Sequence, residues 1–136
     1  MTQNHSDIRT RFIFDDMPIR GMYIRLEKVW HHIVNQKHYP VAIRRALGEL
    51  LAAGSLLSAN LKNEGTLIVQ VQGQGRLKML VVEATSENTV RATARWDETA
   101  EIRDDESLTA LLGENSVFVL THQPKDADPW PGVVPL

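Results

Sequence analysis

The chain contains no cysteine among its 136 residues. This absence excludes disulfides, thiol chemistry and a zinc site built on cysteine ligands. Basic residues are not in excess either, because 15 Lys and Arg stand against 17 Asp and Glu, giving a formal net charge of -2. A nucleic-acid-binding domain usually carries a concentrated basic excess. We therefore expect no nucleic-acid partner.

Long hydrophobic runs are also missing. The longest run, residues 46–61, is interrupted by Glu49 and is shorter than the roughly 20 apolar residues that a membrane-spanning helix needs. The amino-terminal stretch "MTQNHSDIRTRFIF" has no apolar core of the kind found in secretory signal peptides. These two observations predict a cytoplasmic protein without membrane association.

What remains has the composition of one globular domain, 43% hydrophobic and 24% charged. Short strands with short turns between them favour antiparallel pairing. We therefore predict an α+β fold, a twisted antiparallel sheet packed against helices. Hydrophobic periodicity predicts helices at 27–36, 41–62 and 104–113, and strands within 11–16, 19–30, 66–72, 75–84, 89–96 and 116–122.

The stretch "VQVQGQGRLKMLVVEA" contains a glycine pair, Gly73 and Gly75. A dinucleotide-binding fingerprint needs a third small residue and a following helix, but Lys78 and a strand-like pattern follow instead. We interpret the stretch as a β-hairpin with Gly73 and Gln74 as a two-residue type II′ turn. The alternative function is a small-ligand or nucleotide-binding module that uses this hairpin, with Arg76 or Lys78 contacting a phosphate.

Other residue types with chemical potential do not form a recognised motif. The five histidines lack metal-binding spacing, and the acidic run over residues 97–106 lacks the EF-hand pattern. Ser55 and Ser58 lie inside a predicted helix rather than at a nucleophile elbow, so we expect them to bond back to helix carbonyls. The sequence therefore predicts a protein that is not an enzyme.

Over "YPVAIRRALGELLAAGSLLSANLKNEGTLIVQVQGQGRLKMLVVEA" the chain resembles a known family. It is similar to the substrate-binding domain of the redox-regulated thirty-three-kilodalton heat-shock chaperones, the bacterial holdases. The similarity includes the Leu61-Lys62…Gly65 exit from the long helix and the "QxQGxG" hairpin. It extends to "RFIFDDMPIRGMYIRLEKVW", "ARWDE" and the final "GVVPL", and so covers nearly the whole chain.

This resemblance implies an ATP-independent chaperone that binds unfolded proteins during oxidative and heat stress. Members of the family continue into a linker and a small domain whose four cysteines hold zinc as a redox switch. Since those cysteines are absent here, we expect no cofactor in this chain. We expect residues 1–136 to be a partial N-terminal chaperone domain with an incomplete sheet. Exposed sheet edges would then favour a homodimer or a domain-swapped association.

Binding of unfolded clients requires accessible apolar surface rather than a catalytic group. The second faces of the predicted strands provide candidates for such a surface, namely Ile68, Leu80 and Val82. The segment "THQPKDADPWPGVV" departs from the family by its many prolines. Because proline cannot donate a ladder hydrogen bond, we expect weak pairing of the last strand.

Overall fold

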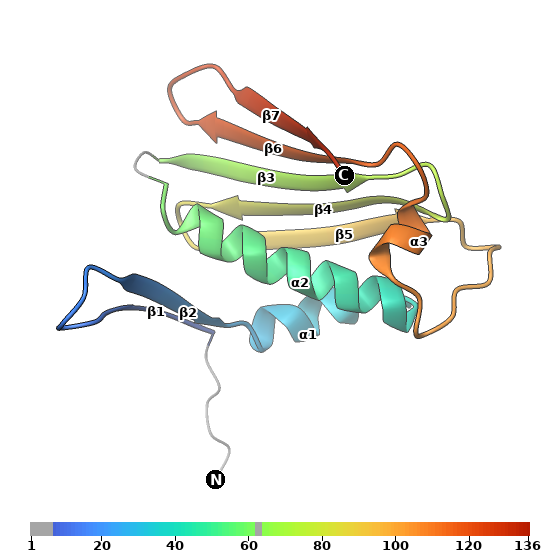
Figure 1. Ribbon diagram of the computed structural model, residues 1–136, viewed down its shortest axis with the longest axis horizontal. Helices are drawn as coiled ribbons and strands as arrows, with labels where there is room; N and C mark the ends of the chain where they lie inside the picture. The colour runs from blue at the N-terminus through green and yellow to red at the C-terminus, as the bar shows by residue number, and fades with distance from the viewer. Residues whose placement is uncertain (1–6, 62–63) are drawn as a thin grey trace, which may run out of the picture.

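The computed structural model describes residues 7–61 and 64–136. A five-stranded antiparallel sheet has the order β5-β4-β3-β6-β7, and a separate two-stranded sheet pairs β1 with β2 (Figure 1). The α+β prediction is therefore confirmed. The elements are β1 (Ile8–Ile13), β2 (Arg20–Arg25), α1 (Lys28–Val34), α2 (Val41–Ser58), β3 (Gly65–Gln72), β4 (Leu77–Thr85), β5 (Val90–Trp96), α3 (Leu108–Leu112), β6 (Val117–Pro124) and β7 (Trp130–Pro135).

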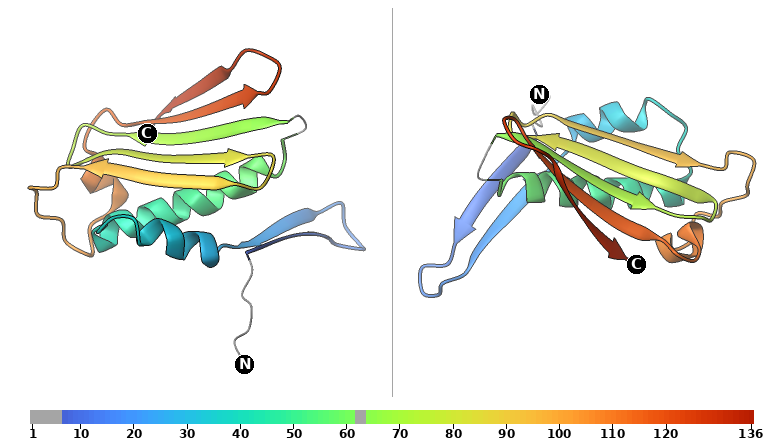
Figure 2. Two further views of the ribbon diagram at one scale, coloured as in Figure 1. Left: turned by 180° about the vertical axis from the view of Figure 1, so that it is seen from behind. Right: turned by 90° about the horizontal axis from the view of Figure 1, so that it is seen from above.

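The core lies between α2 and the meander of β3, β4 and β5. Val69 of β3 lies opposite Val82 of β4, and both side chains are fully buried. Gly54 lets α2 approach this layer closely, because a Cβ at that position would lie only 3.0 Å from Val82 Cγ1. The helices gather on one face of the large sheet and leave its other face open (Figure 2).

The helix predicted over residues 41–62 ends earlier, at Ser58. The Ser58 hydroxyl donates a 2.9 Å hydrogen bond to the Ser55 carbonyl, which satisfies one of the free carbonyls in the last turn. Gly65 begins β3 instead of terminating the helix. A Cβ at Gly65 would lie 2.5 Å from the Gln123 carbonyl oxygen, so the glycine permits close contact between β3 and β6.

The proline-rich tail forms a regular edge strand, so the expected weak pairing is wrong. β7 pairs with β6 along its whole length. The amide of Leu136 donates to the Ser116 carbonyl at 2.9 Å, and inward donors alternate along an antiparallel strand. Pro131 and Pro135 therefore occupy positions whose amides would point away from β6. The ladder loses no hydrogen bond to either proline.

β1 and β2 form a hairpin arm that extends away from the main sheet (Figures 1 and 2). The Phe12 ring covers Gly21 on the opposite strand, where an added Cβ would lie 2.3 Å from the Phe12 Cζ atom. The Arg11 guanidinium donates to the Ala59 carbonyl just after α2. The Asp7 carboxylate at the base of the arm accepts hydrogen bonds from the first amides of α1. These contacts hold the arm against the helices.

Candidate functional site

The three predicted client-binding residues do not lie on one surface. Leu80 and Val82 are 1% and 0% exposed and face α2 in the core, so their prediction as surface residues is wrong. Ile68 lies on the opposite face of the sheet, since its neighbours Leu67 and Val69 are the buried residues of β3. Ile68 is half-buried and remains a candidate.

A β-bulge explains why the two β4 residues were misplaced. The register between β4 and β5 shifts between Leu77 and Met79, where Leu77 lies opposite Trp96 and Met79 lies opposite Arg95. The extra residue, Lys78, reverses the alternation along the rest of β4. Leu77 and Leu80 consequently share the buried face, although simple alternation from Leu77 predicts opposite faces.

The face of the sheet away from the helices carries apolar side chains on four neighbouring strands. Cross-strand partners share a face, and the register pairs Ile68 with Glu83, Gln70 with Val119, and Val119 with Val133. We name the apolar part of this surface the open face. Its members are Ile68, Met79, Val81, Val117, Val119 and Val133.

Solvated faces of antiparallel sheets normally carry polar side chains. Here aliphatic side chains flank Gln70 and Gln72 of the central strand β3, and the charged residues Arg91 and Arg95 stand along the β5 edge. Val133 is 60% exposed. Exposed aliphatic groups gathered on one surface are typical of a protein-binding site. Sequence periodicity did not single out the β6 members, because both faces of "VFVL" are apolar.

The helix-facing side of β6 and β7 adds a second apolar surface. Both strands lie at the edge of the sheet away from α2 (Figure 1). Trp130 and Val134 on these strands' helix-facing side are 59% and 56% exposed. The Trp130 ring meets the His122 ring edge to face, with centroids 6.5 Å apart. The carboxyl-terminal strand pair therefore presents apolar groups on both of its faces.

The glycine hairpin serves packing rather than anion binding. The amides of Gln74 and Gly75 both donate to the Leu112 carbonyl, at 3.0 and 2.8 Å. These are the amides that a phosphate cradle would need. A Cβ at Gly73 would lie 2.7 Å from Leu112 Cδ2, so the glycine pair is required by the close approach of α3.

The turn is also longer than the predicted two-residue type II′ turn. The Gly73 amide donates to the Lys78 carbonyl, and the connection between β3 and β4 spans Gly73, Gln74, Gly75 and Arg76. Gly113 is the only described glycine with a positive φ, whereas a type II′ turn would need one at Gly73. The longer loop allows the hairpin to wrap around the end of α3.

Hydrogen bonds tie the segment between β5 and α3 to this hairpin. Arg76 Nη1 lies 2.7 Å from both carboxylate oxygens of Glu106, and it donates to the Glu101 carbonyl at 2.9 Å. The Thr99 hydroxyl donates to the Asp97 carboxylate at 2.6 Å. This bond, with that of the Thr99 amide, lowers the pKa of Asp97 below its usual value. The acidic run is therefore a structured loop.

Neither a metal site nor a membrane helix is found in the described residues. No group of three His, Asp or Glu side chains within 7–61 and 64–136 is placed to hold a metal ion. In the same ranges, no helix has the length and apolar character needed to cross a membrane.

Ser58 bonds back to a helix carbonyl as predicted, but the buried Ser55 hydroxyl has no partner among the described residues.

Comparison with known proteins assigns the family. A family model described as Hsp33 protein matches residues 7–136. The chain belongs to the Hsp33 family. Its relatives include the 33 kDa chaperonin of Neisseria meningitidis serogroup A, 80% identical over 133 residues. The 33 kDa chaperonin of Chromobacterium violaceum is 45% identical over 138 residues. The family resemblance inferred from the sequence is thus confirmed, although Lys62 of the quoted motif lies outside the described residues.

The match with the Neisseria relative covers 98% of this chain but 44% of the relative. The match with the Chromobacterium relative covers 100% of this chain but 46% of the relative. The chain therefore spans less than half the length of these Hsp33 relatives. The crystal structure of the 33 kDa chaperonin from Thermotoga maritima superposes with a TM-score of 0.78 at 20% identity. That comparison covers 98% of this chain and 46% of the other, and it establishes a shared fold.

Proposed function

We propose that this chain is the client-binding part of an ATP-independent holdase chaperone, and that the open face holds apolar segments of unfolded proteins. The aliphatic side chains gathered on this uncovered sheet face carry the proposal. Unfolded proteins share exposed hydrophobic side chains and little else, so a broad aliphatic surface suits many clients. The relatives' name, 33 kDa chaperonin, supports the same class of activity.

The proposal includes a non-enzymatic role in oxidative and heat stress in the cytoplasm. A redox switch in this protein would need residues other than these 136, since none of them is cysteine. We likewise propose that residues 1–136 form part of a larger N-terminal domain. The small share of each relative that the chain covers supports this division.

We propose self-association through apolar faces rather than through the β7 edge. Pro131 and Pro135 remove two of the outward donors along that edge, which hinders addition of another strand. The alternative function at the glycine hairpin gains no support, because the amides of Gln74 and Gly75 already bond to Leu112.

The experiment is suppression of aggregation of a heat-denatured client, measured by light scattering at molar excess of the chain. Ile68→Asp and Val133→Asp each place a charge on the open face. Val41→Asp is the matched control, since Val41 is an exposed aliphatic residue in the first turn of α2, where a carboxylate is favourable. We expect the two open-face variants to lose suppression and the control to retain it.

Two results would contradict the proposal. One is no suppression by the unmodified chain at any excess over client. The other is equal suppression by all three variants. Circular dichroism checks that each variant is folded, and Val133 is the safer position because a charge on an edge strand is well tolerated.

A further inference from the structure

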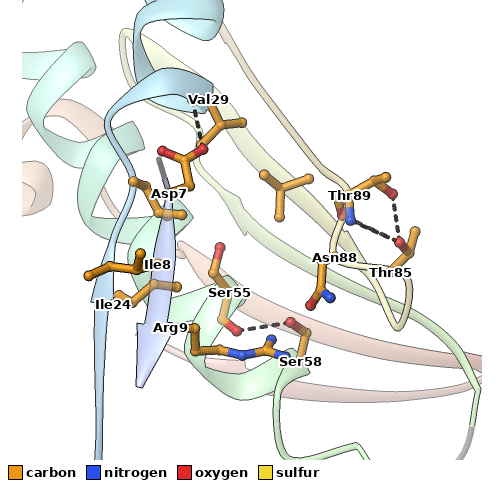
Figure 3. Close-up of a pocket in the computed structure, with 12 residues that line it drawn as sticks. Asp7, Ile8, Arg9, Ile24, Val29, Ser55, Ser58, Thr85, Asn88 and Thr89 are labelled. Atoms are coloured by element: carbon orange, nitrogen blue, oxygen red, sulfur yellow. Dashed lines mark hydrogen bonds between the residues drawn. The ribbon is translucent and has the colours of Figure 1, made fainter. Parts of the chain in front are cut away.

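A pocket separates the hairpin arm from the body of the protein, on the helix side of the sheet (Figure 3). Its volume is about 570 Å³, which is within the usual range for small-molecule sites. Three parts of the chain form its walls: the arm with the start of α1, the last turns of α2, and the β4–β5 turn. The apolar lining residues are Ile8, Ile24, Leu26, Val29 and Val90.

Several polar groups in the pocket are already engaged within the protein. The Asp7 carboxylate accepts three backbone amides of the α1 amino terminus. The Thr85 and Thr89 hydroxyls bond to each other at 2.6 Å. The Ser58 hydroxyl donates to the Ser55 carbonyl. These groups therefore need no ligand to complete their hydrogen bonds.

Three polar groups remain that the described residues do not satisfy. The Ser55 hydroxyl points into the pocket (Figure 3); its residue is only 4% exposed, and the described chain offers it no hydrogen bond. The Arg9 guanidinium has no ion pair or hydrogen bond to a described residue, and neither has the Asn88 side-chain amide. Both line the same pocket.

The free groups are predominantly donors. Arg9 offers several N–H groups in a fork that matches a carboxylate, Asn88 adds an NH₂ group, and Ser55 adds an O–H. Since a buried hydroxyl without a partner is unfavourable, an acceptor in the pocket would remove that cost. The aliphatic walls beside these donors suit a hydrocarbon chain rather than a sugar or a polyanion.

We propose that this pocket binds a carboxylate carried on an apolar chain. Arg9 pairs with the carboxylate, Asn88 and Ser55 supply further hydrogen bonds, and the aliphatic walls cover the stem. Either a fatty acid or the carboxyl end of an apolar peptide provides this chemistry. The pocket is separate from the open face, so the proposal does not depend on client binding there.

The test is titration of the protein followed by ¹H–¹⁵N spectra, with two carboxylates and their uncharged analogues. The probes are octanoate with 1-octanol, and acetyl-Leu-Val-Leu as the free acid with its carboxamide. We expect saturable shifts of the Ser55 and Asn88 amides with at least one acid, and about ten-fold or more weaker binding of its analogue. The acid that binds identifies the lipid-derived or the peptide source.

Matched variants locate the contact. Arg9→Gln should weaken binding of that acid about ten-fold. Arg20→Gln, on the same arm but outside the pocket lining, should leave it unchanged. The proposal is overturned if neither acid gives saturable shifts, if the analogue binds as well as its acid, or if the two arginine variants behave alike.

Discussion

The backbone amide of Gly75 donates a 2.8 Å hydrogen bond to the carbonyl of Leu112, and this contact joins the β3–β4 hairpin to the end of α3. An added Cβ at Gly75 would lie 2.4 Å from the Leu111 carbonyl oxygen. We therefore expect Gly75→Ala to lower the free energy of unfolding by about 1–3 kcal/mol, as overpacking usually does. Urea unfolding measures the change.

Gly132→Ala is the control for this substitution. A Cβ at Gly132 has only the Leu120 carbonyl oxygen nearby, at 3.9 Å, which is an ordinary contact. Its free energy of unfolding should stay close to that of the unmodified chain. A Gly75→Ala variant as stable as Gly132→Ala would contradict the packing role of the hairpin glycine.

Truncating a side chain on the helix-covered face of the sheet should lower the free energy of unfolding more than truncating one on the open face. Leu80→Ala leaves a cavity beneath α2 and should lower the free energy of unfolding by about 2–5 kcal/mol. Ile68→Ala removes a half-buried side chain from the open face and should cost about 1 kcal/mol. Equal losses in urea unfolding would show that the open face is part of the core and not a free surface.

The Asp7 carboxylate caps α1 from outside the helix, because it accepts the amides of Glu27, Lys28 and Val29 at 2.7, 2.8 and 3.0 Å. We expect Asp7→Ala to lower the free energy of unfolding by about 1–2 kcal/mol and to speed amide hydrogen exchange in α1. Asp16→Ala, in the exposed turn of the arm, is the control. Unchanged exchange in α1 would argue against the capping role.

The pKa of Asp97 offers a test of the loop after β5. The Thr99 hydroxyl bond is the main cause that lowers this pKa from 3.8. Because the pKa is lower in the folded state, the ionised carboxyl stabilises the fold at pH values above its unfolded-state pKa. This stabilisation is lost as the pH falls through the folded-state pKa. Thr99→Val should raise the pKa of Asp97 toward 3.8, measured by NMR titration of the carboxyl. An unchanged titration would contradict the assigned cause.

Local periodicity was sufficient to predict the helices and most strands. Apolar alternation in "TLIVQVQ" correctly placed Val69 and Val71 on the buried face. Gly113 ends α3 as predicted, although the helix begins at Leu108, after the Ser107 cap, and not at residue 104. These features depend on neighbours within one or two turns of chain. A single sequence carries that information directly.

The errors arose where the outcome depends on distant segments. The bulge beside Lys78 is a property of the β4–β5 register, and it moved two predicted surface residues into the core. Gly75 was placed at the start of a strand after the predicted Gly73-Gln74 turn, whereas its close contacts are with Leu111 and Leu112 of α3. The pairing of β7 depends on whether the positions of Pro131 and Pro135 direct their backbone nitrogens toward β6 or away from it. Periodicity within one segment contains none of these relationships.

Contact between a client and the open face is the central claim, and site-specific crosslinking tests it most directly. Because the chain has no cysteine, Val133→Cys introduces a unique attachment point for a photoreactive group. Val41→Cys provides the same group on an exposed helix position away from the sheet face. We predict crosslinks to a heat-unfolded client from position 133 and few from position 41. Equal yields from both positions, or none from position 133, would contradict client binding on the open face.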